Sequence, residues 1–390
     1  MGTSLENIRV VEFTQVISGS IAGMLMGDLG AEVIKIEKPV EGDFYREQAL
    51  KVNGISTMFP AYNRNKKSLA IDIRQPAAQE AIRDLIKTAD IVIENFRPGI
   101  MAKNGLGYED LKKVKPDIIM VSISGFGQSG PSSSKPAFDM TISAMSGLMS
   151  VNGTPGNPTK MGPAVVDFLS GIYGAIGAMS ALRYRDINGV GQHVDVAMVD
   201  AAISILDAFM AQYRFTGIEP KANGNRRAGY APVNAYPTAD GAVFISASMN
   251  KHWQALARVM GREDLLAEEK YAVPEGRKQD EEYLENAVAQ WAKQHTTAEI
   301  VTQLDAVSCP CAPVNSISGV MQDEQICYRK SILEFDYPGL GSYPVAAHVP
   351  KYSEMEVNTQ RAPLLGEHNE EILGGILGLT PEQIAALTGV

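Results

Sequence analysis

The sequence predicts an α/β protein with a larger domain built on a parallel sheet and a smaller domain of the α+β class. Three observations lead to this prediction. The chain has 390 residues, which is more than one hydrophobic core usually holds. Its first half alternates short apolar runs with helical patterns, as parallel strands joined by crossover helices do. From Gly217 to Tyr236 the sequence is rich in Gly, Asn, Pro and Arg and has no clear period, which marks a linker or irregular loop.

The first crossover unit lies close to the N-terminus. Ile8–Phe13 is short and largely apolar, as expected for a strand buried on both faces. Gly19–Leu29 is a small-residue helix candidate, and Glu32–Ile36 is predicted to be the second strand. A strand, a helix and a strand of these lengths form one parallel crossover unit.

The same alternation continues to residue 215. Further strands are predicted at Ser68–Ile73, Ile91–Glu94, Ile118–Ile123 and Gln192–Ala197, and helices at Pro76–Ala89, Asp139–Met149, Phe168–Arg185 and Val199–Phe215. Pro76 is compatible with the first turn of its helix, where a missing N–H does no harm.

The second half predicts the smaller domain and a helical tail. A strand at Ala242–Ala247 is followed by helices at Lys251–Met260, Glu281–Lys293 and Thr297–Leu304, which indicates an α+β domain. The tail contains helices at Asn369–Leu377 and Pro381–Leu387. Thr380 is predicted to be the N-cap of the last helix, ahead of Pro381.

Composition narrows the partners and the compartment. The formal net charge is −10, which argues against nucleic acid or an anionic membrane as the main partner. The three cysteines, Cys309, Cys311 and Cys327, suggest free thiols in a reducing, cytoplasmic compartment. No zinc site is expected, because Cys-Pro-Cys lacks the usual ligand spacing. We expect no signal peptide.

The most apolar long stretch is Phe168–Leu182. Polar and glycine residues interrupt it, and it is shorter than the roughly 20 apolar residues that cross a bilayer. It is therefore predicted to be a buried helix, and no membrane partner is expected.

Residues 125–130 match the pattern G-x-G-x-x-G after an apolar run. A dinucleotide site requires a helix that begins within these glycines. Here Gly130 leads into Pro131, three serines, Lys135 and Pro136, which predicts a loop. We therefore expect a tight turn that brings backbone close to a ligand, and no nicotinamide cofactor.

Asp167 is a carboxylate in an unusual apolar setting, between Ala-Val-Val and Phe-Leu. Two compatible interpretations remain open. An aspartate at the start of a helix is a favoured N-cap. A carboxylate in a partly dry pocket can also serve as a nucleophile.

Several longer segments now join Asp167. They are "EVIKIEKP" (32–39), "NRNKKSLAIDI" (63–73), "IENFRPGIMAKNGLGYEDL" (93–111), "SGFGQSGP" (124–131), "PAFDM" (136–140) and "RAPLLGEHNEEIL" (361–373). In this order they closely resemble the class III CoA-transferases, the family of formyl-CoA transferase and carnitine CoA-transferase. The resemblance extends over nearly the whole chain.

The resemblance implies a fold and an assembly. Members have a Rossmann-like large domain formed by the N-terminal part and the C-terminal tail, with a smaller domain inserted between them, and two chains interlock like rings. For this chain it implies a large CoA-binding domain at 1–205 and 325–390 and a small α+β domain at 225–320. Residues 206–224 and 321–324 would be linkers.

The resemblance also implies the reaction. CoA would pass from an acyl-CoA to a free carboxylic acid, a dicarboxylic acid in many relatives. Asp167 would be the nucleophile, through aspartyl anhydride and aspartyl-CoA thioester intermediates. CoA would be a substrate, and neither a permanently bound cofactor nor a metal is implied.

Matching segment by segment, the resemblance implies the binding residues. The CoA contacts would be Val16, Lys38, Ile71, Asn95, Phe96, Arg97 and Lys103, and the substrate end would involve Gln15, Ile17 and Phe138. Ile17 replaces a glutamine and Phe138 a tyrosine of formyl-CoA transferase, which argues against formate and oxalate as substrates. Asn223–Tyr230 is the nearest counterpart of the family's lid. Arg226 or Arg227 is a candidate cation for a second carboxylate.

Two alternatives are weighed against a transferase. The related α-methylacyl-CoA racemases pair such an aspartate with a histidine, and this sequence has Phe138 at the matching position, so a two-base exchange lacks a partner. The second alternative is a CoA-binding protein without catalysis, which would need Asp167 only for capping.

Overall fold

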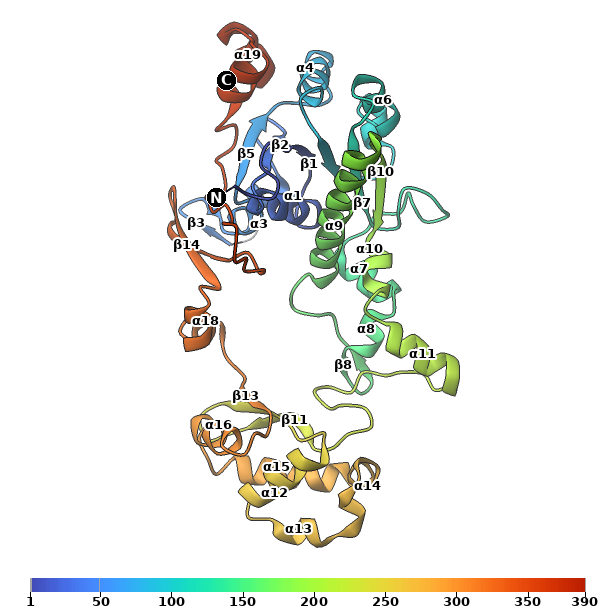
Figure 1. Ribbon diagram of the computed structural model, residues 1–390, viewed down its shortest axis with the longest axis vertical. Coiled ribbons are helices and arrows are strands. Elements are labelled where there is room, and N and C mark those ends of the chain that lie inside the picture. The colour runs from blue at the N-terminus through green and yellow to red at the C-terminus, as the bar shows by residue number, and fades with distance from the viewer. Residues whose placement is uncertain (1, 49, 390) are drawn as a thin grey trace. The chain divides into compact units, whose positions relative to one another are not determined.

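The structure is a computed structural model that describes residues 2–48 and 50–389. It contains two compact units, whose elements are labelled in Figure 1. The sheet unit comprises Met1–Met149, Lys160–Ile218 and Tyr328–Val390. The second unit comprises Ser150–Thr159 and Glu219–Cys327.

The centre of the sheet unit is a 6-stranded, entirely parallel sheet with the order β10-β7-β6-β1-β2-β5. The strands are β1 (Arg9–Phe13), β2 (Glu32–Glu37), β5 (Lys66–Ala70), β6 (Ile91–Glu94), β7 (Ile119–Ser124) and β10 (His193–Ala197). The predicted α/β class with a parallel sheet is confirmed. The order is that of Rossmann folds, and it reverses between β1 and β6. Ligands of such sheets bind beyond the carboxyl ends of the strands at this reversal point.

One face of the sheet is covered by α1 (Ser18–Asp28) and α9 (Val165–Asn188), which pack closely on each other. The approach depends on Gly171. A Cβ atom at this position would lie 2.6 Å from the carbonyl oxygen of Ser18 and 2.6 Å from Cβ of Ile21. Any larger residue would push the helices apart. The contact places the first turn of α9, with Asp167, beside the N-terminus of α1.

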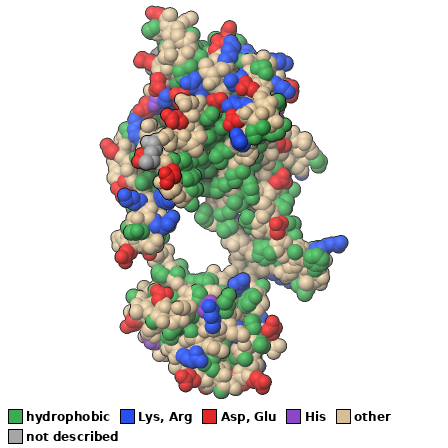
Figure 2. Space-filling model, viewed as in Figure 1, with side chains coloured by type: hydrophobic (Ala, Val, Ile, Leu, Met, Phe, Trp, Pro, Cys, Tyr) green, Lys and Arg blue, Asp and Glu red, His purple; other side chains and the backbone are tan. Residues whose placement is uncertain are grey.

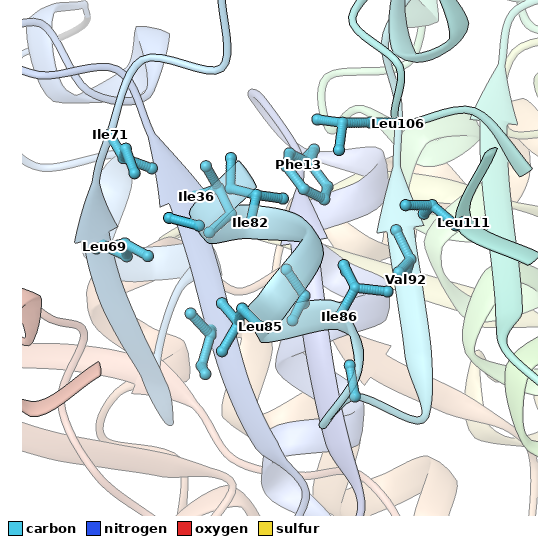
Figure 3. Close-up of a cluster of buried hydrophobic side chains, with 14 of the residues drawn as sticks. Phe13, Ile36, Leu69, Ile71, Ile82, Leu85, Ile86, Val92, Leu106 and Leu111 are labelled. Atoms are coloured by element: carbon cyan, nitrogen blue, oxygen red, sulfur yellow. The ribbon is translucent and has the colours of Figure 1, made fainter. Parts of the chain in front are cut away.

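The opposite face carries the larger hydrophobic core, shown in part in Figure 3. Ile82, Leu85 and Ile86 of α4 (Pro76–Ile86) lie against the side chains of the strands. The helix α6 (Tyr108–Val114) and a π-helical segment at Glu370–Ile376 cover the same face. Because both faces are buried, the central strands are almost continuously apolar.

The C-terminal segment returns to the edge of this sheet. After the antiparallel pair β14 (Ile332–Tyr337) and β15 (Gly341–Ala346), the backbone N–H of Ser68 donates to Nδ1 of His368 at 3.2 Å. The N–H of Ala70 donates to Oδ1 of Asn369 at 2.9 Å. The last helix is α19 (Pro381–Thr388), and its predicted N-cap is confirmed, since the Thr380 hydroxyl accepts from the Gln383 N–H.

The second unit packs helices against a 3-stranded antiparallel sheet with the order β11-β12-β13. Its elements are β11 (Val233–Pro237), β12 (Ala242–Ser246), β13 (Cys311–Pro313), α12 (Asn250–Val259), α13 (Glu263–Ala267), α14 (Pro274–Gln279), α15 (Glu281–Ala292) and α16 (Thr297–Asp305). The strand β11 overlaps the stretch Gly217–Tyr236 that was predicted to be irregular, so the prediction is wrong from Val233 onward.

Other boundaries differ from the sequence prediction. Asp139–Met149 divides into α7 (Asp139–Met145) and α8 (Leu148–Val151), and Val199–Phe215 divides into α10 (Met198–Ile203) and α11 (Asp207–Thr216). The strand β5 starts at Lys66, before the predicted Ser68, because carboxylates neutralise its two lysines. Lys66 contacts Glu12 at 2.8 Å and Lys67 contacts Glu32 at 2.5 Å.

The remaining short elements were not predicted. They are α2 (Phe44–Glu47), β3 (Lys51–Val52), β4 (Ile55–Ser56), α3 (Phe59–Tyr62), α5 (Ile100–Lys103), β8 (Gly153–Thr154), β9 (Asn157–Pro158), η1 (Glu269–Ala272), α17 (Ile317–Val320) and α18 (Glu324–Tyr328).

The helix α9 corrects one argument made from the sequence. It is longer than predicted, and by length and composition alone it is apolar enough to cross a membrane. The prediction that this stretch is too short to cross a bilayer is therefore wrong. A single such helix is weak evidence, because a core helix passes the same test. In the sheet unit α9 packs on α1 and β7, where Gly174 lies against Ile123.

Candidate active site

The predicted site residues surround two adjoining cavities at the point where the strand order reverses. The larger cavity has a volume of about 610 Å³. The smaller cavity, which we call the Asp167 cavity because Asp167 lines it, has a volume of about 190 Å³. It is also lined by the loops that follow β1 and β6. Gln15 and Phe96 line both cavities, so the two are neighbours.

The structure brings the predicted nucleophile, CoA contacts and substrate contacts to these cavities, but not the candidate cations Arg226 and Arg227. The Asp167 cavity is lined by Val16, Ile17, Asn95, Arg97, Phe138 and Asp167, the larger cavity by Lys38, Ile71 and Lys103, and both by Gln15 and Phe96. All of these residues belong to the sheet unit.

Asp167 lies in the first turn of α9 but does not cap it. The N-cap residue is Ala164, and its side chain makes no capping hydrogen bond. Instead, Oδ2 of Asp139 accepts hydrogen bonds from the N–H groups of Val166 at 2.8 Å and Asp167 at 3.2 Å. The N-cap interpretation of Asp167 is therefore wrong. Because Asp139 binds these groups, the Asp167 carboxylate is free to face the cavity.

The environment of Asp167 makes its ionised form costly. Burial, with a further contribution from the nearby charge of Asp139, raises the pKa of Asp167 to about 7. In the described parts of the chain no hydrogen-bond donor reaches its side-chain oxygens. Burial also raises the pKa of Tyr45 to about 12 and that of Tyr62, and the charge of Asp167 contributes to both shifts. The carboxylate is therefore poorly solvated, and its protonated form is favoured more than that of an aspartic acid in water.

Asn95 joins the two loops that form the Asp167 cavity. Its Oδ1 accepts from the N–H of Gln15 at 2.8 Å, and its Nδ2 donates to the carbonyl oxygen of Gln15 at 2.8 Å. The side chain of Gln15 is also engaged, because its Oε1 accepts from the N–H of Phe44 at 2.8 Å. Asn95, which the sequence predicted as a ligand contact, thus also fixes the backbone of Gln15.

The larger cavity combines apolar walls with charged groups of both signs, and its carboxylates are Glu37, Glu41, Glu47 and Asp72. Phe13, Ile36, Ile71, Ile73, Phe96 and Ile100 are among its lining residues, together with Lys38, Arg74 and Lys103. Lys38 pairs with Glu41 at 2.6 Å and Arg74 with Asp72 at 2.6 Å. Lys103 has no ion pair within residues 2–48 and 50–389. Exposed ion pairs contribute little, so Lys38 and Arg74 can turn to phosphate groups at small cost. Such a cavity suits an aromatic base with phosphates.

The glycine run forms a loop, as expected. Gly127 and Gly130 have φ values of 82° and 97°, and no helix starts within the run. Gly125 lines the Asp167 cavity. A Cβ atom at Gly125 would lie 2.1 Å from Cβ of Ala137, so only glycine allows these two loops to approach. The prediction of a loop in place of a helix is confirmed, and its closeness to a ligand stays a prediction.

Known proteins resemble this chain over almost its whole length. The family model described as CoA-transferase family III matches residues 5–369. The succinyl-CoA–D-citramalate CoA-transferase of Chloroflexus aurantiacus is 34% identical over 387 residues, which cover 98% of this chain and 96% of that protein. The succinyl-CoA:glutarate CoA-transferase of Mus musculus is also 34% identical, over 96% of this chain and 86% of that protein.

A solved structure has the same fold. The CaiB/BaiF family protein from Brucella suis matches with a TM-score of 0.88 and 32% sequence identity. The match covers 96% of this chain and 100% of that one.

The chain belongs to CoA-transferase family III.

The CoA-transferase contains site residues that the sequence did not indicate. The role of Asp139 has no local signal in the sequence, because its contacts in α9 lie 27 and 28 positions further along the chain. Lys135 lines the Asp167 cavity, and Arg74 lines the larger cavity. Lys135 lies between two segments that resemble the family, and Arg74 directly follows another. Cations beside those segments are therefore the signal that could have indicated both residues.

The suggested arginines of the CoA-transferase differ in availability. Both belong to the second unit. Arg226 is ion-paired with Glu282 at the surface. The guanidinium of Arg227 lies 4.8 Å from the ring centre of Tyr230, and the described residues offer it no carboxylate partner.

The described residues give no support to a racemase or to a metal site. None of the five histidines lines the Asp167 cavity, and Phe138 occupies the place of the second acid–base group. Within residues 2–48 and 50–389, no group of three or more His, Cys, Asp or Glu residues is arranged to hold a metal ion.

The raised pKa of Asp167 predicts an acid limb in the pH profile of the CoA-transferase. If Asp167 is the nucleophile, only its ionised form can attack a thioester, and kcat/KM for the acyl-CoA should fall as the pH drops through about 7. Asp139→Asn removes a negative charge while an amide oxygen remains to cap α9. This change should lower the pKa of Asp167 and move the limb to lower pH.

Glu94→Gln is the matched control for this pH profile. Burial raises the pKa of Glu94 to about 7 as well, but Glu94 lines a different cavity, with Ser122 and His193. The limb should stay in place in this variant. A limb that moves with Glu94→Gln and not with Asp139→Asn would show that Asp167 does not control the profile.

Proposed function

We propose that this CoA-transferase moves CoA from an acyl-CoA to a free carboxylic acid through covalent intermediates on Asp167. The observation that carries the proposal is the state of this carboxylate. It is partly buried, it has a raised pKa, and no protein donor of the described chain binds its oxygens. It also lines a small cavity beside one that suits a nucleotide.

The first half of the reaction transfers CoA to the enzyme. An oxygen of Asp167 attacks the thioester carbonyl, the carbon–sulfur bond breaks, and a mixed anhydride and CoA thiolate result. The thiolate then attacks the carbonyl carbon of Asp167. This step releases the donor acid, with one oxygen from Asp167, and leaves an aspartyl-CoA thioester.

The second half is the reverse sequence with the acceptor acid. Its carboxylate attacks the Asp167 thioester and expels the thiolate, so a second anhydride forms. The thiolate attacks the acceptor's carbonyl carbon, and the Asp167 carboxylate is restored with one oxygen from the acceptor. Poor solvation and alignment make a weakly nucleophilic carboxylate reactive enough for both attacks.

We infer that the nucleotide end of CoA binds in the larger cavity. The apolar side chains, Ile71 among them, suit the adenine ring, and Lys38, Arg74 and Lys103 suit the phosphates. The pantetheine arm would then run past Phe96 and Val16 to Asp167. This path is supported by the two cavities, which share Gln15 and Phe96.

We infer that the acid substrate is a short dicarboxylic acid. Arg97 and Lys135 line the Asp167 cavity, and within the described residues neither forms an ion pair, so a cation is available for a second carboxylate. Several relatives are named as succinyl-CoA-dependent transferases. The test is a mass-spectrometric screen of acceptor acids with succinyl-CoA and acetyl-CoA as donors. Preference for monocarboxylic acids would contradict the inference.

The resemblance also supports an interlocked homodimer, with the second unit inserted into the Rossmann-like large domain. The sheet unit exposes a broad apolar area around α9 and α10, seen in Figure 2. Exposed members include Met145, Ile172, Ile176, Ile203, Ile205, Phe209 and Met210. Apolar areas of this kind usually mark an interface. An active monomer in light scattering at micromolar concentration would contradict the dimer.

The thiols support a cytoplasmic location. Cys309, Cys311 and Cys327 are all free, as expected in a reducing compartment. Cell fractionation that finds the protein outside the cytoplasm would contradict this proposal.

Asp167→Asn tests the proposed nucleophile. An amide cannot attack the thioester as a carboxylate does, so kcat should fall by about a thousandfold or more. The fold should persist, because Asp139 provides the cap of α9. Since the pKa of Asp167 is raised in the folded state, its ionisation lowers stability as the pH rises from the ordinary value to about 7. The variant should therefore unfold at the same or a higher temperature than the wild type at about pH 8.

Asp139→Asn is the matched control for this substitution, since it changes a neighbouring carboxylate to an amide of the same size. It should keep substantial transferase activity. Activity that survives in a folded Asp167→Asn protein would show that another residue is the nucleophile.

Substitution of the cations tests the CoA path. Lys103→Gln and Arg74→Gln should raise KM for the acyl-CoA by about tenfold each, with a smaller change in kcat, because the phosphates do not react. The KM for the acid should remain unchanged. Lys113→Gln is the control, since Lys113 lies in α6 and does not line the cavity. Equal effects of all three substitutions would argue against a phosphate site in the larger cavity.

A further inference from the structure

The turn that lines the Asp167 cavity has a strained backbone at Val16. Its φ angle is 64°, in the left-handed region that β-branched residues rarely adopt. Backbone strain of this kind persists only where the surrounding structure fixes it, and it is common in active sites. Val16 lines the cavity together with Gln15 and Ile17, so the strain lies in the part of the chain that faces Asp167.

One carboxylate holds this turn from the side of α2. Oδ1 of Asp43 accepts hydrogen bonds from the N–H of Val16 at 3.2 Å and from the N–H of Tyr45 at 2.9 Å. Asp43 is also the N-cap of α2. The N–H of the strained residue Val16 is thus bound directly by the side chain that caps α2.

A buried lysine fixes Asp43 in turn. Nζ of Lys35 lies 3.0 Å from Oδ2 of Asp43, and both side chains are 0% exposed. The same Nζ donates to the carbonyl oxygen of Thr14 at 2.8 Å and to its hydroxyl at 2.9 Å. Lys35 therefore connects Asp43 to the end of β1, two residues before Val16. The pKa of Lys35 is raised because the charges of Asp43 and Glu12 outweigh the effect of burial.

The surrounding charges are balanced. Glu12, with 0% exposure, contacts Lys35 at 3.3 Å and Lys66 at 2.8 Å. Two carboxylates and two lysines thus share this buried cluster. Buried ion pairs often add little net stability, because both charges lose their hydration. A role in specifying one geometry explains the cluster better than a role in stability.

We infer that the Lys35–Asp43 ion pair is a positioning device that holds the strained Val16 turn against the Asp167 cavity. It acts through the backbone of residues 14–16 and does not touch the reacting atoms. The inference rests on the proposed role of Asp167. Both the ion pair and the turn lie within the sheet unit.

A double-mutant cycle between Asp43 and Val16 tests the inference. Asp43→Asn removes the ion pair with Lys35, so the side chain that binds Val16 is no longer held in place. The turn should then relax from its strained conformation, and kcat should fall by about tenfold or more. Val16→Gly removes the strain, since glycine adopts positive φ freely. The loss of kcat caused by Asp43→Asn should therefore be at least about threefold smaller in the Val16→Gly protein than in the wild type.

Asp28→Asn is the matched control. Asp28 forms a buried ion pair with Arg64 in the same unit but does not contact the turn. Its loss should lower the unfolding temperature without lowering kcat per folded protein. Should Asp43→Asn not fold, Lys35→Met replaces it in the cycle, because the N–H partners of Asp43 then remain.

The outcomes separate the two proposals. Equal losses of kcat in the wild-type and Val16→Gly backgrounds, each proportional to the unfolded fraction, would show that the ion pair has only a structural role. An active, folded Asp167→Asn protein would instead overturn the assignment of the nucleophile, whatever the cycle shows.

Discussion

The start of α9 has backbone N–H groups that need a hydrogen-bond acceptor, and the acceptor is Asp139 rather than Asp167. If Asp167 had to cap its own helix, its oxygens would be engaged and solvated by N–H groups. With Asp139 in that role, the Asp167 carboxylate remains partly buried and without a protein donor in the described chain. The same arrangement adds a like charge, which contributes to the raised pKa of Asp167. In the proposed reaction, Asp167 is reactive because Asp139 caps the helix in its place.

The sheet and its helices provide the setting for this carboxylate. The reversal of strand order between β1 and β6 opens a crevice at the carboxyl ends of the strands. Gly171 lets α9 pack against α1, so Asp167 reaches that crevice from the side. Asn95 then ties the loops after β1 and β6 together. Residues far apart in the sequence thus meet within one small cavity.

The sequence was a good guide to elements whose pattern is local. The buried parallel strands and the cap at Thr380 follow from short apolar runs and from neighbouring residues. The sequence prediction failed where a residue far along the chain determines the structure of an element or the role of a side chain. Lys66 and Lys67 are strand residues because Glu12 and Glu32 neutralise them. Asp167 is not a cap because Asp139, which lies 28 positions earlier in the sequence, binds the N–H groups of α9. The site residues came from family resemblance. Their meeting around two cavities, and the strain at Val16, depend on tertiary structure that no local pattern records.

The most direct test of the central claim follows oxygen atoms. The proposed reaction returns one oxygen of the acceptor acid to Asp167 in each turnover. Incubation with acyl-CoA and an acceptor acid labelled with heavy oxygen in its carboxylate should therefore place the label in the peptide that contains Asp167. Mass spectrometry of a digest would locate it, and the unlabelled acid serves as control. Label in that peptide alone, dependent on acyl-CoA, is the predicted result. Complete turnover with no label in the Asp167 side chain would contradict the account.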